Sequence, residues 1–98
     1  MDTPTLKARF QLGECFTTPG VLALLKFPQM PLVELAEFLH RHMAGEWGEG
    51  EPSDHAENER ALEEGRRVMS VYMLGGEQIW IMTNADRLTT TILTPEEY

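Results

Sequence analysis

The last third of the chain, residues 66–98, carries the pattern that most constrains the fold. Short runs rich in β-branched and aromatic residues alternate there with turn residues: RRVMSVYML, Gly75-Gly76, EQIWIMT, NADR and LTTTIL. Such runs are typical of β-strands, and a glycine pair tolerates the positive φ angles of a two-residue hairpin turn. The segment therefore predicts a three-stranded antiparallel meander.

A tight Gly-Gly turn also predicts which residues lie opposite each other. It places Leu74 opposite Glu77 and Val71 opposite Trp80, and the register follows outward from there. A four-residue turn at 84–87 then predicts three pairs between the second and third strands: Thr83–Leu88, Ile81–Thr90 and Trp80–Thr91. Large apolar side chains fall on both faces of this sheet, so each face is expected to need a cover.

Two helices are expected before the meander. Threonine followed by proline at 18–19 is typical of a helix start, and the apolar run after it predicts a largely buried helix over about 19–26. The second helix is predicted over about 31–42, after the proline-flanked break at 27–31. It has an apolar stripe at helical spacing, formed by Leu32, Leu35, Ala36, Leu39 and Met43.

A third helix and a further strand complete the predicted elements. Asp54 and Glu57 have the spacing of a capping box, which predicts a polar helix from about Ser53 to Glu64, ended by Gly65. The segment 8–16 is a candidate additional strand. The sequence thus predicts one α+β domain over residues 1–98, with three helices packed on a three- or four-strand antiparallel β-meander.

Composition limits the classes of function. The formal net charge of −8 disfavours direct binding to nucleic acid or to anionic membranes, because both attract basic surfaces. Cys15 is the single cysteine, which leaves no intrachain disulfide and indicates a reducing cytoplasm. The chain shows neither a membrane-spanning apolar run nor an apolar signal segment, so we expect a cytoplasmic protein. We also expect no cofactor.

The histidines and Trp47 are further candidates for site residues. His40 and His42 lie two residues apart on one predicted helix, so they point to different sides and do not suit a metal site. We expect His42 at the surface and His40 at the edge of the core or in a capping position. Two interpretations are open for Trp47, which lies in the acidic loop GEWGEGE: a lid folded onto the domain, or an anchor for a partner.

Three blocks of the sequence together resemble a known family: HRHMAGEWG, NERALEEGRRVMSVY and IWIMTNADRLTTTILTPEEY. The family consists of short uncharacterised bacterial proteins found on plasmids and other mobile DNA, and the resemblance covers about Leu12 to Tyr98. Some members are labelled as modification subunits of type I restriction enzymes. A methyltransferase needs a longer chain with a glycine-rich cofactor loop, so the resemblance implies an accessory protein and no methyl transfer.

Three functions follow from these patterns. The first is noncatalytic protein binding, by a homodimer or a protein partner, through Trp47 and a sheet face holding Met69, Trp80, Met82 and Thr91. The second is a small ribonuclease-like or other hydrolytic enzyme, with His40, Arg67, Arg87 and Thr90 as base, phosphate clamp and transition-state donor. The third is an acidic inhibitor that imitates nucleic acid, using Glu49, Glu51, Asp54, Glu57, Glu59, Glu63 and Glu64. We favour the first, because no motif in the chain specifies a reaction.

Overall fold

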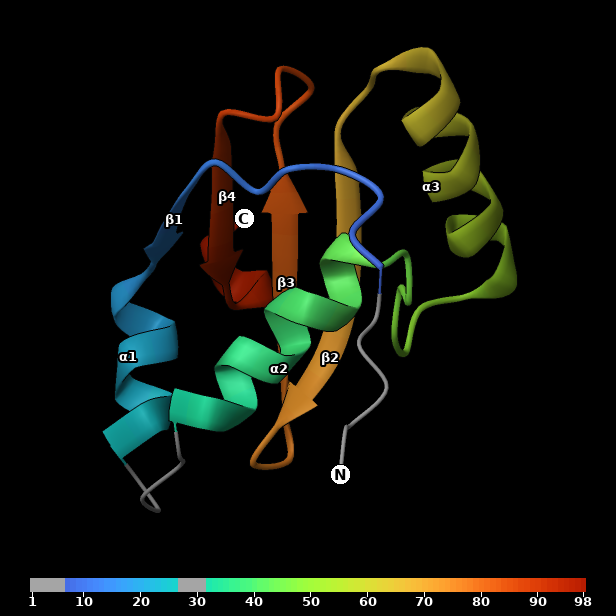
Figure 1. Ribbon diagram of the computed structural model, residues 1–98. Coiled ribbons are helices and arrows are strands. Elements are labelled where there is room, and N and C mark those ends of the chain that lie inside the picture. Colours follow the sequence, from blue (N-terminus) through green and yellow to red (C-terminus); the bar gives the residue numbers. More distant parts are fainter. Residues whose placement is uncertain (1–6, 27–31) are drawn as a thin grey trace, which may run out of the picture.

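The computed structural model describes residues 7–26 and 32–98, which form three helices, a short 3-10 turn and a four-stranded sheet (Figure 1). The predicted α+β class is confirmed. In chain order the elements are β1 (Glu14–Thr17), α1 (Pro19–Lys26), α2 (Leu32–Met43), α3 (Pro52–Glu64), β2 (Val68–Leu74), β3 (Glu77–Thr83), β4 (Thr89–Leu93) and η1 (Pro95–Glu97). The predicted break at 27–31 lies outside the described residues.

The β2–β3 hairpin has the predicted register. Leu74 pairs with Glu77 and Val71 pairs with Trp80. Gly75 and Gly76 have φ angles of 61° and 84°, which residues with a Cβ adopt only at a steric cost. The two glycines therefore set the register of the longest strand pair in the sheet.

The predicted register between β3 and β4 is wrong by two residues. Thr83 pairs with Thr90 and Trp80 pairs with Leu93. The connection is longer than a four-residue turn because Arg87 adopts a positive φ of 61°, and the Leu88 amide donates to the Asp86 carboxylate instead of entering the ladder. A shift of two residues keeps every side chain on its predicted face.

The sheet has the strand order β1-β4-β3-β2, and β1 runs parallel to β4. The expected additional strand is therefore present, but the sheet is mixed and not purely antiparallel. Most of the chain separates β1 from β4, so no tight turn forces the two strands into opposite directions. The Glu14 amide donates to the Leu88 carbonyl at 2.9 Å, and the Thr18 amide donates to the Ile92 carbonyl at 3.0 Å.

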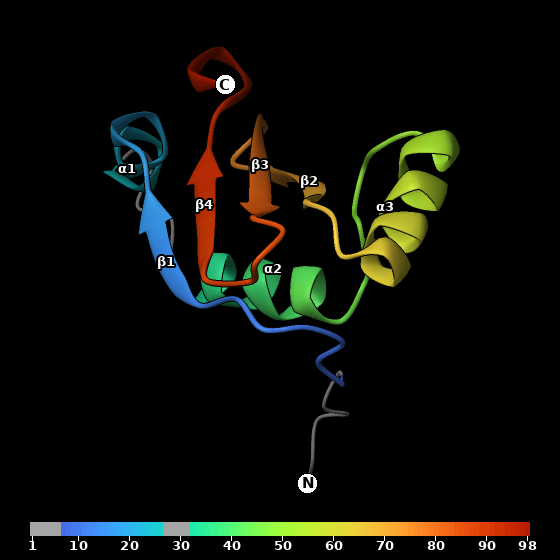
Figure 2. The same ribbon diagram turned by 90° about the horizontal axis from the view of Figure 1, so that it is seen from above.

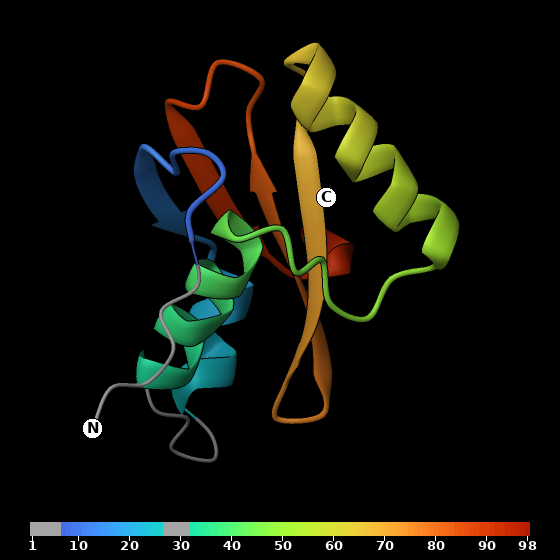
Figure 3. The ribbon, with the colours of Figure 1, turned by 45° about the vertical axis from the view of Figure 1, so that its right-hand side comes forward.

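The helices within the described residues cover only one face of the sheet. Figure 2 shows α2 on one side of the strands and the C-terminal turn on the other, while α3 stands beside β2 (Figures 1 and 3). The main core lies between this covered face and the first two helices. It consists of Val21, Leu35, Phe38, Tyr72, Leu74, Ile79, Ile81 and Ile92.

Several helix details differ from the sequence-based expectations. Within residues 19–25 of α1 only Val21 is fully buried and Leu22 is 47% exposed, because the helix lies at the β1 side of the sheet and not inside a second layer. In α2 the buried positions include Leu35 and Phe38, whereas Ala36 is exposed. The N-cap of α3 is Glu51 with no side-chain cap bond, since Pro52 already occupies the first turn.

A helix crosses a membrane only if it is both long and apolar. Among the helices within residues 7–26 and 32–98, none has both the length and the apolar character needed to cross a bilayer.

Candidate functional site

The face of the sheet opposite α2 is the candidate site, and we call it the open face. Alternate residues of β2, β3 and β4 point to it, since successive side chains in a strand alternate in direction. Their neighbours on the covered face are almost all fully buried, whereas residues of the open face retain solvent contact, except Leu93 of β4, which is 4% exposed. The open face consists of Glu14, Phe16, Met69, Val71, Met73, Gln78, Trp80, Met82, Thr89, Thr91 and Leu93.

Four of the five predicted binding residues lie on the open face: Met69, Trp80, Met82 and Thr91. The register aligns Phe16, Thr91, Met82 and Met69 in one row across all four strands. Phe16 is 50% exposed, and the other three side chains are half-buried. This row is apolar except for the hydroxyl of Thr91, and none of the described helices covers it.

The C-terminal turn covers one corner of the open face. The Tyr98 ring packs edge-on against Trp80 with centroids 5.4 Å apart, and Arg67 donates to the Tyr98 hydroxyl at 2.9 Å. The Trp80 indole N–H donates to the Gln78 side chain at 3.0 Å. Trp80 is therefore held in one orientation but only half-buried in a single chain, whereas its mid-strand position would suggest full burial.

The turn itself is anchored by Glu97. Its carboxylate accepts hydrogen bonds from the Gly20 amide at 2.8 Å and from the Thr94 amide at 2.9 Å. The hydroxyl of Thr18 donates to the same carboxylate, and these bonds lower the pKa of Glu97 to about 2. The carboxylate stays ionised near neutral pH and ties the end of the chain to the start of α1.

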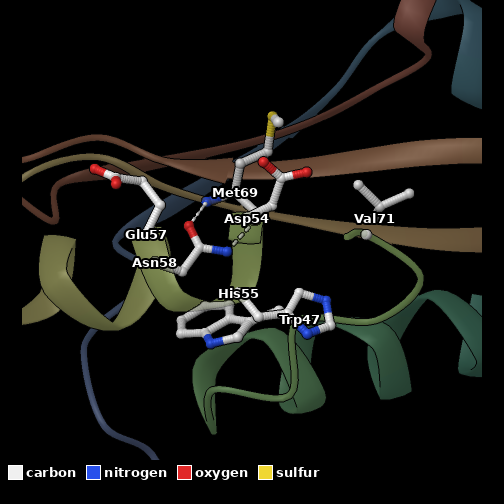
Figure 4. A pocket seen from close by; sticks show the side chains of 8 residues that line it. Trp47, Asp54, His55, Glu57, Asn58, Met69 and Val71 are labelled. Atoms are coloured by element: carbon white, nitrogen blue, oxygen red, sulfur yellow. Dashed lines mark hydrogen bonds between the residues drawn. The ribbon is translucent and has the colours of Figure 1, made fainter. Parts of the chain in front are cut away.

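A hollow of about 180 Å³ lies between α3 and β2 and continues the open face (Figure 4). Met69 and Val71 contribute to its wall from the sheet, and two carboxylates, Asp54 and Glu57, contribute from α3. The His55 Nε2 atom in this hollow is buried and has no hydrogen-bond partner among the described residues. The hollow therefore combines an apolar floor with an acidic wall.

The outer edge of β2 is occupied by protein groups. The Asn58 side-chain amide donates to the Met69 carbonyl at 2.7 Å and accepts from the Met69 amide at 3.1 Å, as the dashed lines in Figure 4 show. The Val71 amide donates to the Trp47 carbonyl at 3.0 Å, and the Glu49 amide donates to the Val71 carbonyl at 2.7 Å. An edge whose backbone groups are satisfied in this way does not recruit another strand.

Trp47 belongs to this edge and is not an exposed anchor. Its side chain is 5% exposed, and its ring is stacked on Phe10 with centroids 6.3 Å apart. The indole N–H donates to Glu59 at 3.0 Å. Of the two interpretations left open by the sequence, the structure has Trp47 folded onto the domain.

His42 was expected at the surface but is buried in the core. It is 0% exposed, and its ring nitrogens hydrogen-bond the Ser70 and Thr83 hydroxyls, while Thr83 bonds Thr90 at 2.7 Å. Burial, with a smaller contribution from the positive charge of Arg87, lowers the pKa of His42 to about 3. His40, expected at the core edge, is exposed instead.

A sequence signal for this burial did exist. Leu35, Phe38 and His42 are spaced three and four residues apart, which places them on one helical stripe. The first two are buried, so His42 is carried to the same side. Its polar atoms are accommodated because Ser70 and Thr83 face α2 from the sheet.

The four catalytic candidates do not form one constellation. His40 is exposed on α2, on the covered side of the sheet, whereas Arg67 bonds Tyr98 on the opposite side. Thr90 is fully buried and donates to the Leu12 carbonyl at 2.7 Å. The Arg87 guanidinium lies over the Phe10 ring, 5.3 Å from its centroid.

The carboxylates of α3 are partly neutralised by arginines. Arg9 forms a two-pronged ion pair with Glu59, and the Arg9 hydrogen bond is the main cause that lowers the pKa of Glu59 to about 2. Glu57 pairs with both Arg60 and Arg66. These pairings interrupt the continuous negative surface that imitation of nucleic acid requires.

Neither the metal-ligating residue types among the described residues nor the comparisons with known proteins assign a function to this chain. Among the described residues, no group of three or more histidine, cysteine, aspartate or glutamate side chains is placed to hold a metal ion. No family model, curated protein or solved structure matches this chain.

Proposed function

We propose that this chain is a noncatalytic protein-binding module, acting as a small accessory protein of bacterial mobile DNA as its sequence resemblance implies. One observation carries the proposal: among the described residues the helices cover only one face of the sheet, and the other face presents a methionine and tryptophan surface. Contiguous apolar surface of this kind marks interaction sites in soluble proteins.

The composition of the open face indicates how it binds. Met69 and Met82 have flexible, polarisable side chains that adapt to different apolar shapes. Trp80 is held by Tyr98 and Gln78, so it supplies a rigid aromatic contact at little entropic cost. The face therefore suits the apolar side of a peptide segment better than a small polar molecule.

The charges around the face indicate the chemistry of the partner. Asp54 lines the adjoining hollow, Glu14 lies at the opposite edge, and the chain as a whole has a net charge of −8. Glu57 also lines the hollow, but Arg60 and Arg66 already pair with it. A partner with lysine or arginine beside its apolar residues would be attracted and oriented by these groups. We therefore assign the open face to a basic amphipathic segment of another protein.

Binding is favoured over catalysis because the polar cluster around His42 is closed. His42, Ser70, Thr83 and Thr90 are each 0% exposed, and they hydrogen-bond one another. A histidine with a pKa of about 3 that bonds two hydroxyls beneath a helix has no route to a substrate. The cluster is best understood as a satisfied part of the core.

The test titrates the protein with a peptide of alternating leucine and lysine and follows binding by calorimetry. Met82→Ser removes apolar area from the centre of the face and should weaken binding about tenfold, equivalent to about 1.4 kcal/mol. The matched control is Leu22→Ser, because Leu22 is 47% exposed on α1 and is not one of the residues of the open face. A leucine–glutamate peptide should bind far more weakly.

Two results would count against this proposal. Equal affinity of the wild type and Met82→Ser for the basic peptide would mean that binding occurs elsewhere. Equal affinity for the basic and acidic peptides would mean that the charges around the open face select nothing.

A further inference from the structure

We infer that two copies of this chain pair through the outer edge of β1 in antiparallel orientation and join their sheets into one. This inference goes beyond the proposed function, because it concerns the edge of the sheet and stands whatever partner the open face takes. It follows from the backbone geometry of β1, from the exposure of Phe16 and from the difference between the two edges of the sheet.

The outer edge of β1 carries hydrogen-bonding groups that its neighbour β4 does not use. The Glu14 and Thr18 amides donate to carbonyls at the β4 side, at 2.9 and 3.0 Å. Because backbone groups of successive residues point to opposite sides of a strand, those of Cys15 and Thr17 point away from β4. Among the described residues β1 lies at the end of the sheet, so these groups face outward.

A twofold axis at Phe16 satisfies both outward-pointing residues at once. In that arrangement Cys15 lies opposite Thr17 of the second copy, and the two residues exchange N–H to carbonyl hydrogen bonds. Thr17 and Cys15 of the second copy form the same pair of bonds on the other side of the axis. Phe16 then lies opposite Phe16 of the second copy in a position without backbone bonds, with Cα atoms about 4.5 Å apart. The ring is 50% exposed in a single chain, and cross-strand aromatic pairs stabilise sheets.

The charges of the strand permit self-pairing despite the net negative charge of the chain. Glu14 is the one charged residue of β1, and the proposed register sets it opposite Thr18 of the second copy and not opposite another carboxylate. Like charges placed directly opposite would oppose pairing. The seam itself therefore contains no repulsive pair.

The two edges of the sheet explain why association stops at two copies. A strand order in which β1 joined β2 of a second copy would leave free edges and grow into a fibre. Asn58 and the Trp47 loop already occupy the outer groups of Met69 and Val71 on β2. Pairing of β1 with β1 is symmetric and closes on itself.

The pairing would also extend the open face. Phe16 ends the row formed with Thr91, Met82 and Met69, so a second copy continues this row across the seam. Two open faces then lie side by side on one surface. A partner with two binding segments would engage this surface more tightly than a single segment.

Disulfide cross-linking tests the register. Phe16→Cys in a Cys15→Ser background should give a covalent dimer under mild oxidation, since Cα atoms about 4.5 Å apart fit disulfide geometry. The wild-type Cys15 should not cross-link, because it faces Thr17 and lies diagonally, about 8 Å, from the second Cys15. Met73→Cys in the same background is the control, because Met73 lies on β2 and is similarly exposed at 44%.

Sedimentation of the full chain tests the association itself. We expect the wild type to be dimeric at micromolar concentration, and Phe16→Lys to weaken the dimer at least tenfold by setting two like charges opposite each other. Leu22→Lys, at a comparable exposure on α1, should leave the dimer intact. Circular dichroism of both variants confirms that the fold is retained.

Three outcomes would overturn the inference. They are a wild type that sediments as a monomer of 11.2 kDa, a dimer that survives Phe16→Lys, and a cross-link from Met73→Cys as rapid as from Phe16→Cys. A dimer lost in Met82→Ser but retained in Phe16→Lys would assign the seam to the open face. In contrast, loss of peptide binding alone would leave the β1 pairing untouched and count only against the proposed function.

Discussion

Acidification should destabilise this protein through His42. The folded chain holds this imidazole neutral, with a pKa of about 3 compared with an ordinary value of 6.5. In the unfolded chain the imidazole is free to bind a proton below about pH 6.5. The unfolded state therefore gains protons that the folded state does not, and stability falls as the pH falls.

The magnitude follows from the difference between the two pKa values. A pH of about 5 is about 1.5 units below the pKa of the imidazole in the unfolded chain. Protonation of that imidazole then stabilises the unfolded state by about 2 kcal/mol. Stability is fully present above about pH 6.5 and continues to fall until the folded pKa of about 3 is reached. The loss is large because folding removes solvent contact from both ring nitrogens.

Urea unfolding followed by tryptophan fluorescence, to which the buried Trp47 and the half-buried Trp80 both contribute, measures this dependence. The free energy of unfolding of the wild type should drop by about 2 kcal/mol between about pH 7.5 and pH 5. His42→Gln removes the titrating group and should flatten this slope, even if it lowers stability at every pH. His40→Gln, on the same helix but exposed, should keep the wild-type slope.

One result would refute the reasoning: the same pH slope in His42→Gln as in the wild type. That result would mean that His42 is protonated in the folded state or accessible to water. It would also remove the argument that the cluster is closed to substrates.

Two further substitutions test the edge of β2. Asn58→Ala removes both side-chain hydrogen bonds to Met69 and should lower the free energy of unfolding by about 2 kcal/mol. Glu63→Ala, on the exposed side of α3, should change this free energy little. Equal losses for the two variants in urea unfolding would contradict the role of Asn58. Gly48→Ala would place a Cβ 1.9 Å from the Val71 carbonyl oxygen at a φ of 86°, and should cost at least about 3 kcal/mol. Gly65→Ala also has a positive φ but no atom within 4 Å, so its cost should stay near 1 kcal/mol, and similar melting temperatures for the two variants would argue against the close approach at Gly48.

Local sequence determined the elements whose causes lie within a few residues. The Gly75-Gly76 turn specified the β2–β3 register, because both glycines adopt the positive φ angles that a two-residue hairpin needs. The alternation of side chains then assigned each residue of the meander to a face, and this assignment survived the two-residue error in β4. The predicted helices also lie near their observed positions, since proline and glycine mark their ends locally.

Sequence reasoning failed where distant contacts decide the outcome. The burial of His42 depends on hydroxyls that β2 and β3 supply, and these lie 28 and 41 residues away in the chain. The side chain of Asn58 became an edge cap only because α3 stands beside β2 (Figure 3). The helical stripe with Leu35 and Phe38 indicates that His42 faces the core, but no local pattern identifies the groups that either side chain bonds.

The sequence by itself determined that the sheet has two apolar faces, and tertiary structure decided which face is covered. Strand alternation is a local property, and it places methionine and tryptophan on one side as readily as isoleucine and tyrosine on the other. Packing α1 and α2 buries whichever face fits their shapes, and here that is the face of Tyr72, Ile79 and Ile81. The other face stays open because the burial of a face depends on which elements of the whole chain pack against it. The described helices supply no second layer to cover this face.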